Sequence, residues 1–315
     1  TLARHKGIDF IICDHHLPGG EIPNAVAVLD PKRDDCEYPF KELSGCGLGF
    51  KLIQAFAQKF RSQEEVYEYL DLVVISIASD IVPISGENRI LAHFGLQKLN
   101  QNPRPGLKAL KEIAAIKNDL DISGIVFTLG PRINAAGRVA HAQGAVELLI
   151  ASSDEEANQL AEKVNIKNDL RREFDVNITE EAIAMIESNE NLRAAKSTVL
   201  FKETWHKGVI GIVAARCVEK YYRPTVILTE SNNKVTGSAR SVKDFDLYKA
   251  IDECSDLLEK FGGHKYAAGL TLDRSNLLAF QERFEQIVSA TLTDDMRTPV
   301  VEIDIPMQFD AMTSK

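Results

Sequence analysis

The sequence lacks the features of a membrane protein, of a secreted protein and of a disulfide-stabilised one. No apolar run reaches the roughly 18–20 residues that span a bilayer, and no signal peptide is visible. The five cysteines are scattered and form no C-x-x-C pair, which argues against a zinc knuckle or a disulfide framework. We therefore expect a cytoplasmic protein with reduced thiols and no membrane contact.

An excess of basic residues is also missing. The formal net charge is -9, from 37 Lys and Arg against 46 Asp and Glu, which argues against a histone-like basic surface. Nucleic acid remains a possible partner, because a few arginines in a groove can outweigh a distant acidic exterior. At 315 residues, the chain is long enough for two domains.

The chain begins without methionine, and both of its ends look interrupted. Residues 1–6 resemble the last turn of a helix that stops at Gly7, and residues 8–13 follow as an apolar run typical of a buried strand. Residues 299–309 begin a strand-like alternation that has no predicted partner. We expect the sequence to be an internal fragment of a longer protein.

Strand and helix signals alternate along the chain, which predicts an α/β fold in two lobes. The first lobe has a strand at 25–29, a loop at 31–40 and helices at 48–60, 64–78, 88–99 and 105–116. Residues 154–189 contain no proline or glycine and carry periodic apolar positions, which predicts a long connecting helix. The second lobe has strands at 197–201, 224–228, 234–239 and 267–272 and helices at 209–221, 247–258 and 276–292.

An Asp-His-His triplet follows the first predicted strand, and open α/β sheets build their sites at the carboxyl ends of strands. In an extended chain Asp14 and His16 would share one face and His15 the other, so a turn at Pro18 to Gly20 is needed to gather all three. The alternative is a polar strand end that caps a turn. Asp80 ends an apolar helical run; it is either a solvated helix end or a partner of the triplet at a Mn²⁺ or Mg²⁺ site.

The stretch LGPRINAAGR, residues 129–138, predicts an irregular loop because it contains two glycines and a proline. An arginine on a constrained loop suits phosphate, since its planar fork makes two parallel hydrogen bonds. The alternative is a surface loop whose arginines pair with nearby acids. The candidate phosphate contacts are Arg132, Asn134 and Arg138.

Three stretches of the second lobe are compatible with an anionic ligand. WHKGVIG runs into a predicted helix, whose N-terminal amides favour anions; TGSARS ends a strand; and FGGHKYAAG precedes another. Each alone is also compatible with a tight turn, but together they favour a nucleotide or an anionic polymer. Their candidate residues are Ser238, Arg240, Gly262, Gly263 and His264.

These motifs resemble, in order and over essentially the whole chain, those of the RecJ-like single-strand-specific 5′→3′ DNA exonucleases of the DHH phosphoesterase superfamily. Asp-His-His and Gly-Gly-His fit many superfamily members. The stretches YPFKELSG, GENR and GPRINAAGR are more specific to the RecJ-like family.

The resemblance implies an α/β architecture in four parts, with single-stranded DNA in a cleft between two lobes. Residues 1–150 would be a truncated DHH catalytic domain with a mostly parallel sheet, and residues 151–195 the connecting helix. Residues 196–297 would be the DHH-associated domain, and residues 298–315 the start of an oligonucleotide-binding barrel.

The resemblance also implies roles for the candidate residues. His15 and Asp80 would bind the catalytic pair of Mn²⁺ or Mg²⁺ ions, and Asp14 and His16 would bind metal, contact phosphate or orient ligands. Arg132, with Asn134 and Arg138, would contact the phosphate near the cut. Ser238 and Arg240 would bind the 5′-terminal phosphate, and Gly262, Gly263 and His264 the DNA backbone.

One departure from the family pattern is serious. Members also use an Asp-x-Asp motif and a further aspartate upstream of where this sequence begins. Two divalent ions carry +4, while Asp14 and Asp80 supply only -2. We therefore expect an active exonuclease in the whole protein but a fragment that is catalytically inactive or nearly so.

As a RecJ-like enzyme, the whole protein would act in DNA recombination and repair, as a monomer, beside a helicase and a single-strand DNA-binding protein. One alternative is a DHH oligoribonuclease or nucleotide phosphodiesterase. The other is a catalytically inactive DNA-binding subunit, in which the upstream acids would be substituted.

Overall fold

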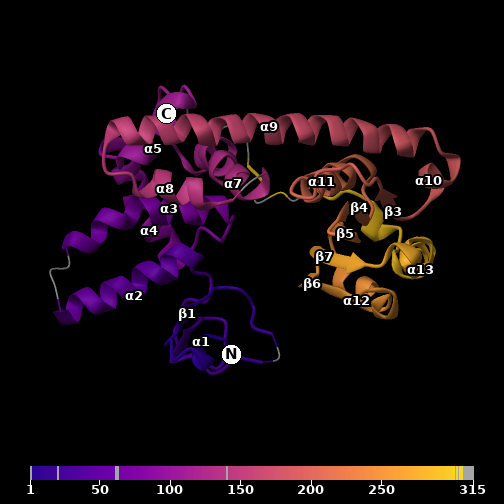
Figure 1. Cartoon of the computed structure of the whole chain (residues 1–315), viewed down its shortest axis with the longest axis horizontal. Helices are drawn as coiled ribbons and strands as arrows, with labels where there is room; N and C mark the ends of the chain where they lie inside the picture. Colours follow the sequence, from indigo (N-terminus) through magenta and orange to yellow (C-terminus); the bar gives the residue numbers. More distant parts are fainter. Residues whose placement is uncertain are drawn as a thin grey trace. The chain divides into compact units, whose positions relative to one another are not determined.

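The structure is a computed structural model that describes residues 2–19, 21–60, 64–139, 141–301, 303 and 305–307 (Figure 1). The chain divides into two compact units, Thr1–Leu170 and Arg171–Lys315. Both contain helices and a sheet, which confirms the predicted α/β class.

A short parallel sheet opens unit 1. Helix α1 (Leu2–His5) ends before Gly7, and strands β1 (Ile11–Cys13) and β2 (Ala27–Leu29) pair in parallel. The predicted buried strand over residues 8–13 needs correction, because β1 is shorter and Ile11 is more than half exposed. Within the described residues this sheet has two strands, and such a ribbon buries little on either face.

Helices form the rest of unit 1, around the apolar helix α3 (Leu70–Ser79), which is buried on nearly every side. A Cβ on Gly95, in helix α4 (Gly86–Gln101), would lie 2.6 Å from the Leu70 carbonyl oxygen, so only glycine allows α4 to approach α3 this closely. The predicted helix at 64–78 begins as a 3₁₀ helix, η1 (Glu64–Tyr69). The other helices are α2 (Gly45–Phe60), α4 (Gly86–Gln101), α5 (Pro105–Ile113), α6 (Ile122–Gly124) and α8 (Gln143–Ile150).

The stretch LGPRINAAGR is helical, which corrects the predicted loop. A π-helical turn, η2 (Ile125–Leu129), runs directly into α7 (Gly130–Val139). Pro131 directly follows the π-helical turn, where the regular i→i−4 hydrogen-bond pattern is already interrupted, so its missing N–H is tolerated. Gly137 lies in the last turn of α7. Proline and glycine are therefore compatible with helix at these positions.

Helix α9 (Asp154–Glu187) has 34 residues and confirms the predicted long helix. The boundary between the two units falls within it, between Leu170 and Arg171. The short helix α10 (Glu190–Ala194) follows, and Asn189 caps it by accepting hydrogen bonds from the first-turn amides.

Unit 2 is built on a mixed sheet with strand order β3-β4-β5-β7-β6. The β3–β4 pair is parallel and the other pairs are antiparallel. The strands are β3 (Thr198–Phe201), β4 (Thr225–Ser231), β5 (Lys234–Arg240), β6 (Lys260–His264) and β7 (Ala267–Leu272). The sequence missed β6 because Gly262-Gly263 is typical of a turn; in the sheet a Cβ on Gly263 would lie 2.3 Å from the Ala267 carbonyl oxygen.

Two helices of unit 2, α11 (Ile210–Tyr221) and α13 (Leu277–Thr291), agree with the predicted positions, whereas the predicted helix at 247–258 is shorter, because it ends at Asp252 and a separate 3₁₀ turn follows at residues 255–257. The side chains of Phe280, Phe284 and Val288 are fully buried in a core that contains strand residues such as Val226 and Leu270. The helical segments are α11 (Ile210–Tyr221), α12 (Leu247–Asp252), η3 (Ser255–Leu257), η4 (Arg274–Asn276), α13 (Leu277–Thr291) and η5 (Asp295–Arg297).

The predicted strand at 299–309 lies partly outside the described residues, which leave out 302, 304 and 308–315. The described residues of that segment are not in a strand, and the predicted start of a further domain stays a prediction. Within the described ranges, no helix combines the length and apolar character needed to cross a bilayer.

Candidate metal centre and phosphate-binding residues

The pair His15–Asp80 is the centre of the candidate site in unit 1. His15 follows β1, Asp80 ends α3, and His15 Nε2 lies 3.2 Å from Asp80 Oδ2. The His15 side chain is 14% exposed and that of Asp80 44%. A Cβ on Gly45, at the start of α2, would lie 3.5 Å from His15 Cδ2, so Gly45 borders the ring. The structure thus brings together two of the three residues predicted as metal ligands, His15 and Asp80, and Asp14 is not in contact with either side chain.

Asp14 faces His16 instead of the His15–Asp80 pair. Asp14 Oδ1 accepts hydrogen bonds from the backbone N–H groups of His15 and His16 and lies 2.7 Å from His16 Nδ1. The hydrogen bond with the His16 side chain lowers the pKa of the Asp14 carboxyl. Asp14 therefore shapes the turn that carries His15, and its role among those that the sequence left open stays a prediction.

Asp80 is followed by a turn that contains a strained residue and that a buried amide joins to a neighbouring loop. Ile81 has a φ of +55°, which is rare for a β-branched side chain and marks local strain. Asn88 is fully buried, and its Nδ2 donates to the carbonyl oxygens of Glu42 and Pro83. These bonds tie the turn after Asp80 to the loop that leads to Gly45. Sequence reasoning missed Asn88, whose only signal was its place in the GENR motif.

The YPFKELSG and GENR motifs also contact each other directly. Tyr38 Oη donates to the Glu87 carboxylate at 2.7 Å, and Lys51 Nζ lies 3.1 Å from Glu87 Oε2. Gly86, with a φ of +48°, lies under the Phe40 ring, where a Cβ would come within 2.7 Å. These contacts join the loop that contains YPFKELSG to the start of α4.

The donor set at His15 and Asp80 fits a divalent ion but does not complete its coordination. An imidazole nitrogen and a carboxylate oxygen both suit Mn²⁺, whereas such ions take about six ligands. Among the residues that the structure describes, no group of three or more His, Cys, Asp or Glu side chains is placed to hold one ion. The pair is therefore part of a possible metal site, and further ligands are needed.

Helix α7 starts beside the Asp80 end of α3. A Cβ on Gly130 would lie 2.9 Å from the hydroxyl oxygen of Ser79, the residue before Asp80. Arg132 lies in the first turn of α7, whereas Asn134 and Arg138 lie exposed farther along the same helix. The fold therefore brings the first turn of α7, with Arg132, next to the end of α3 that carries Asp80.

Ser238 and Arg240 lie at the end of β5, beside the first turn of α11. Arg240 Nη1 donates to Ser238 Oγ at 3.2 Å and to the Ala239 carbonyl oxygen at 2.8 Å. A Cβ on Gly211 would lie 2.8 Å from Ser238 Oγ and 3.2 Å from Arg240 Nη2. The helix N-terminus predicted from WHKGVIG and the strand end predicted from TGSARS are thus neighbours, as an anion site requires.

The Gly-Gly-His stretch joins the same surface through strand register. Ser238 pairs with Gly269, which pairs with Gly262, and Arg240 pairs with Ala267, which pairs with His264. At about 4.8 Å between neighbouring strands, the two motifs lie roughly 10 Å apart. His264 Nδ1 also accepts a hydrogen bond from the backbone N–H of Tyr266.

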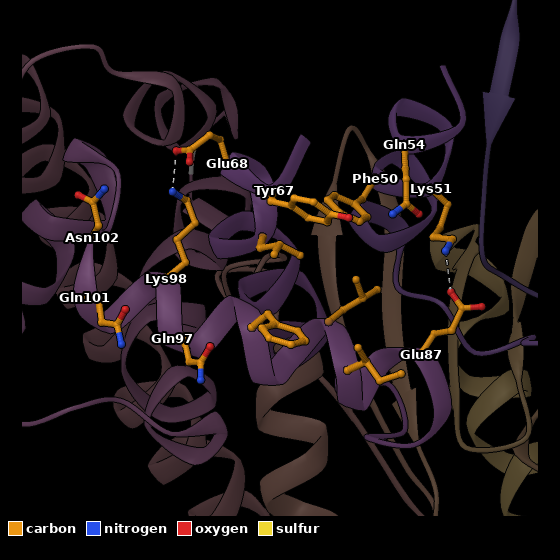
Figure 2. A pocket seen from close by; sticks show the side chains of 14 residues that line it. Phe50, Lys51, Gln54, Tyr67, Glu68, Glu87, Gln97, Lys98, Gln101 and Asn102 are labelled. Atoms are coloured by element: carbon orange, nitrogen blue, oxygen red, sulfur yellow. Dashed lines mark hydrogen bonds and ion pairs between the residues drawn. The ribbon is translucent and has the colours of Figure 1, made fainter. Parts of the chain in front are cut away.

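Unit 1 also has a groove of about 760 Å³ between α2, η1 and α4 (Figure 2). Its lining is apolar, with Phe50 and Tyr67 among the side chains, and its rim carries the ion pairs Lys51–Glu87 and Lys98–Glu68. No predicted site residue lines this groove.

Two family models match parts of the two units. The profile of the "DHH family, N-terminal domain" matches residues 1–77, and that of the "DHHA1 domain" matches residues 191–290. A single-stranded-DNA-specific exonuclease RecJ from Bacillus subtilis is 38% identical over 99% of the chain, and one from Escherichia coli is 34% identical over 99%. The chain spans 39% and 57% of these relatives, respectively.

Solved structures of RecJ are also similar to this chain. The crystal structure of RecJ in complex with Mn²⁺ from Thermus thermophilus matches with a TM-score of 0.81 and 28% identity, over 91% of this chain and 42% of that one. A structure of exonuclease RecJ bound to manganese matches with a TM-score of 0.76 and 29% identity, over 94% of this chain and 73% of the other.

Proposed function

We propose that the whole protein is a metal-dependent exonuclease, because the chain belongs to the DHH family and is homologous to RecJ over nearly its whole length. Its substrate would be single-stranded DNA, degraded from the 5′ end. The observation that carries the proposal is the approach of His15 Nε2 to Asp80 Oδ2, two metal-type donors from separate elements of unit 1, of which residues 1–77 match the DHH domain.

In this proposal, His15 and Asp80 supply part of the ligand set of a Mn²⁺ or Mg²⁺ pair. Bound ions of this kind activate a water molecule and stabilise charge on the phosphoryl oxygens. Asp14 and His16 orient His15 through their hydrogen bonds. The described residues bring no third His, Cys, Asp or Glu side chain into a group with this pair. Further carboxylates of the whole protein would complete the coordination.

Arg132, at the start of α7, contacts the phosphate near the cut and offsets its developing charge. Asn134 and Arg138 continue along α7 and bind the neighbouring backbone. A guanidinium suits this role because its planar fork matches two phosphate oxygens at once. Contacts of this kind give little sequence preference and a strong dependence of affinity on salt.

Ser238 and Arg240 bind the 5′-terminal phosphate with the first-turn amides of α11, and this would explain action from one end. The support is the approach of Gly211 to both side chains. Gly262 and His264, which share strand register with Ser238 and Arg240, and Gly263 between them contact the DNA backbone next to that phosphate.

We further propose a domain plan of a DHH domain at 1–150, a connecting helix at 151–195, a DHH-associated domain at 196–297 and the start of an oligonucleotide-binding barrel at 298–315. A single-strand substrate requires an activity that unwinds duplex DNA, such as a helicase, and a protein that covers the strand. The whole protein would act as a cytoplasmic monomer in recombination and repair.

The test is an assay of the whole protein with Mn²⁺ on end-labelled single-stranded and double-stranded DNA, with a chelator control. The proposal expects mononucleotides from the 5′ end of single strands only. Equal degradation of blunt duplexes, or activity restricted to very short RNAs or nucleotides, would favour a phosphodiesterase of another type. Metal-independent binding without cleavage would indicate a DNA-binding subunit.

A further inference from the structure

The guanidinium of Arg132 is held at two points by groups of unit 1. Arg132 Nε donates to Asn165 Oδ1 on α9 at 3.0 Å, and Nη1 donates to the Thr128 carbonyl oxygen at 2.9 Å. The Thr128 carbonyl belongs to the π-helical turn η2, one turn before Arg132. Because a guanidinium is planar and rigid, two bonds to different atoms fix the orientation of its whole fork.

Asn165 is itself oriented by a carboxylate. Its Nδ2 donates to Asp169 Oδ2 at 3.1 Å, one helical turn along α9. An ionised carboxylate only accepts hydrogen bonds, so the amide NH₂ must face Asp169 and the amide oxygen must face Arg132. Asp169 therefore selects the one amide orientation in which Asn165 accepts from Arg132.

The choice of an amide matters for charge. A carboxylate in direct contact with Arg132 would offset the positive charge that a phosphate needs, whereas an amide oxygen accepts the hydrogen bond and stays neutral. Asp169 sets the geometry from one residue farther away. The Asn165 contact therefore fixes the orientation of the arginine and adds no negative charge of its own.

We propose that Asn165, oriented by Asp169, is a positioning residue that holds Arg132 in the orientation in which it contacts the phosphate. The inference rests on the proposed function, since it assumes that Arg132 acts on a phosphate. An arginine side chain has many rotamers and loses entropy when it is fixed on binding, and a misplacement of about 1 Å at a reacting centre can cost about 100-fold in rate. Asn165 supplies this orientation before substrate arrives.

The test measures kcat, KM and thermal midpoint in the whole protein for Asn165→Ala, Arg132→Ala and the double variant. Asn165→Ala is expected to lower kcat by about 10- to 100-fold with an unchanged thermal midpoint, and to add nothing to Arg132→Ala. Asn158→Ala, at an exposed position of the same helix, is the matched control and should leave the rate unchanged.

Losses that add in the double variant, or an Asn165→Ala protein with wild-type kcat, would overturn the inference. If Asn165→Ala fails to fold, Asp169→Leu replaces it, because Asp169 is exposed. That variant frees the amide to turn and should lower kcat in the same direction, and wild-type kcat would again contradict the inference. An inactive wild-type protein would instead show that the proposed function has failed.

Discussion

His15 Nε2 lies 3.2 Å from Asp80 Oδ2, and this contact joins the first strand of unit 1 to the end of its most buried helix. Both side chains are metal-type donors, and neither element could place its residue there alone. The hydrogen bonds of Asp14 shape the turn that carries His15, and those of Asn88 hold the turn that follows Asp80.

Removing one donor of this pair should weaken metal binding sharply. Asp80→Asn keeps the shape of the side chain but removes its charge, and we expect Mn²⁺ affinity to fall by more than the 10- to 100-fold typical of losing an outer-shell partner. Isothermal titration calorimetry of the whole protein measures this, with the exposed Asp119→Asn as control. Equal affinities for the three proteins would remove Asp80 from the metal centre.

The buried amide of Asn88 should contribute to the stability of the fold. Asn88→Ala leaves the Glu42 and Pro83 carbonyls without their buried donor, so the free energy of unfolding should fall by about 1–3 kcal/mol. Urea denaturation measures the change, with the exposed Asn118→Ala as control. A loss no larger than that of the control would show that these two hydrogen bonds contribute nothing to stability.

The Ser238–Arg240 region should determine the preference for phosphorylated ends. Arg240→Ala removes a charged donor worth about 1.5–3 kcal/mol, so activity on 5′-phosphorylated strands should fall about 10- to 100-fold. Gly211→Ala should act in the same direction, because its Cβ displaces the ends of both side chains. Gly49→Ala, where the added Cβ meets nothing within 4 Å, is the control. Equal losses on 5′-hydroxyl strands would reject the assignment.

The stability of unit 2 should depend on pH through Glu285. Burial acts to raise the pKa of this carboxyl, but hydrogen bonds from Ser197, Lys196 and Ser289 outweigh it and hold the pKa below its ordinary value. A lowered carboxyl pKa stabilises the fold above the ordinary value, about 4.3, and this stabilisation disappears as pH falls through the folded-state pKa.

Glu285→Gln should therefore lower the free energy of unfolding by about 1–3 kcal/mol at pH 7, with a difference from wild type that shrinks below about pH 4. Denaturant titrations over pH 3 to 7 test this, with the exposed Glu282→Gln as the control on the same helix. A difference that does not change with pH would exclude the carboxyl as its source.

Most elements can be predicted from periodicity, because the spacing of apolar residues along a segment is a local property of the sequence. The absence of proline and glycine predicts α9, and apolar spacing predicts α3 and α13. Two predictions were wrong because glycine and proline were taken as signals of loops and turns: the loop at 129–138 and the turn in place of β6. In α7 they lie in the first and last turns, and in β6 glycines are needed because neighbouring backbone comes within 2.3 Å of where a Cβ would lie.

The site was only partly predictable. The residue types of His15, Asp80 and Arg132 indicate chemistry, so the sequence singles them out. Asn88 and Asn165 carry no such signal, since an asparagine in a helix gives no indication of which distant oxygen or guanidinium its amide meets. Their roles depend on contacts between elements far apart in the chain, and only the folded structure reveals them.

The order in which labels leave a doubly labelled strand tests the central claim most directly. A 5′-phosphorylated single strand with different labels on its first and last nucleotides is treated with the whole protein and Mn²⁺, beside the Asp80→Asn variant. We predict that the 5′ label is released first, as a mononucleotide, and that the variant releases neither. Release of the 3′ label first, internal fragments, or equal activity of the variant would contradict the account.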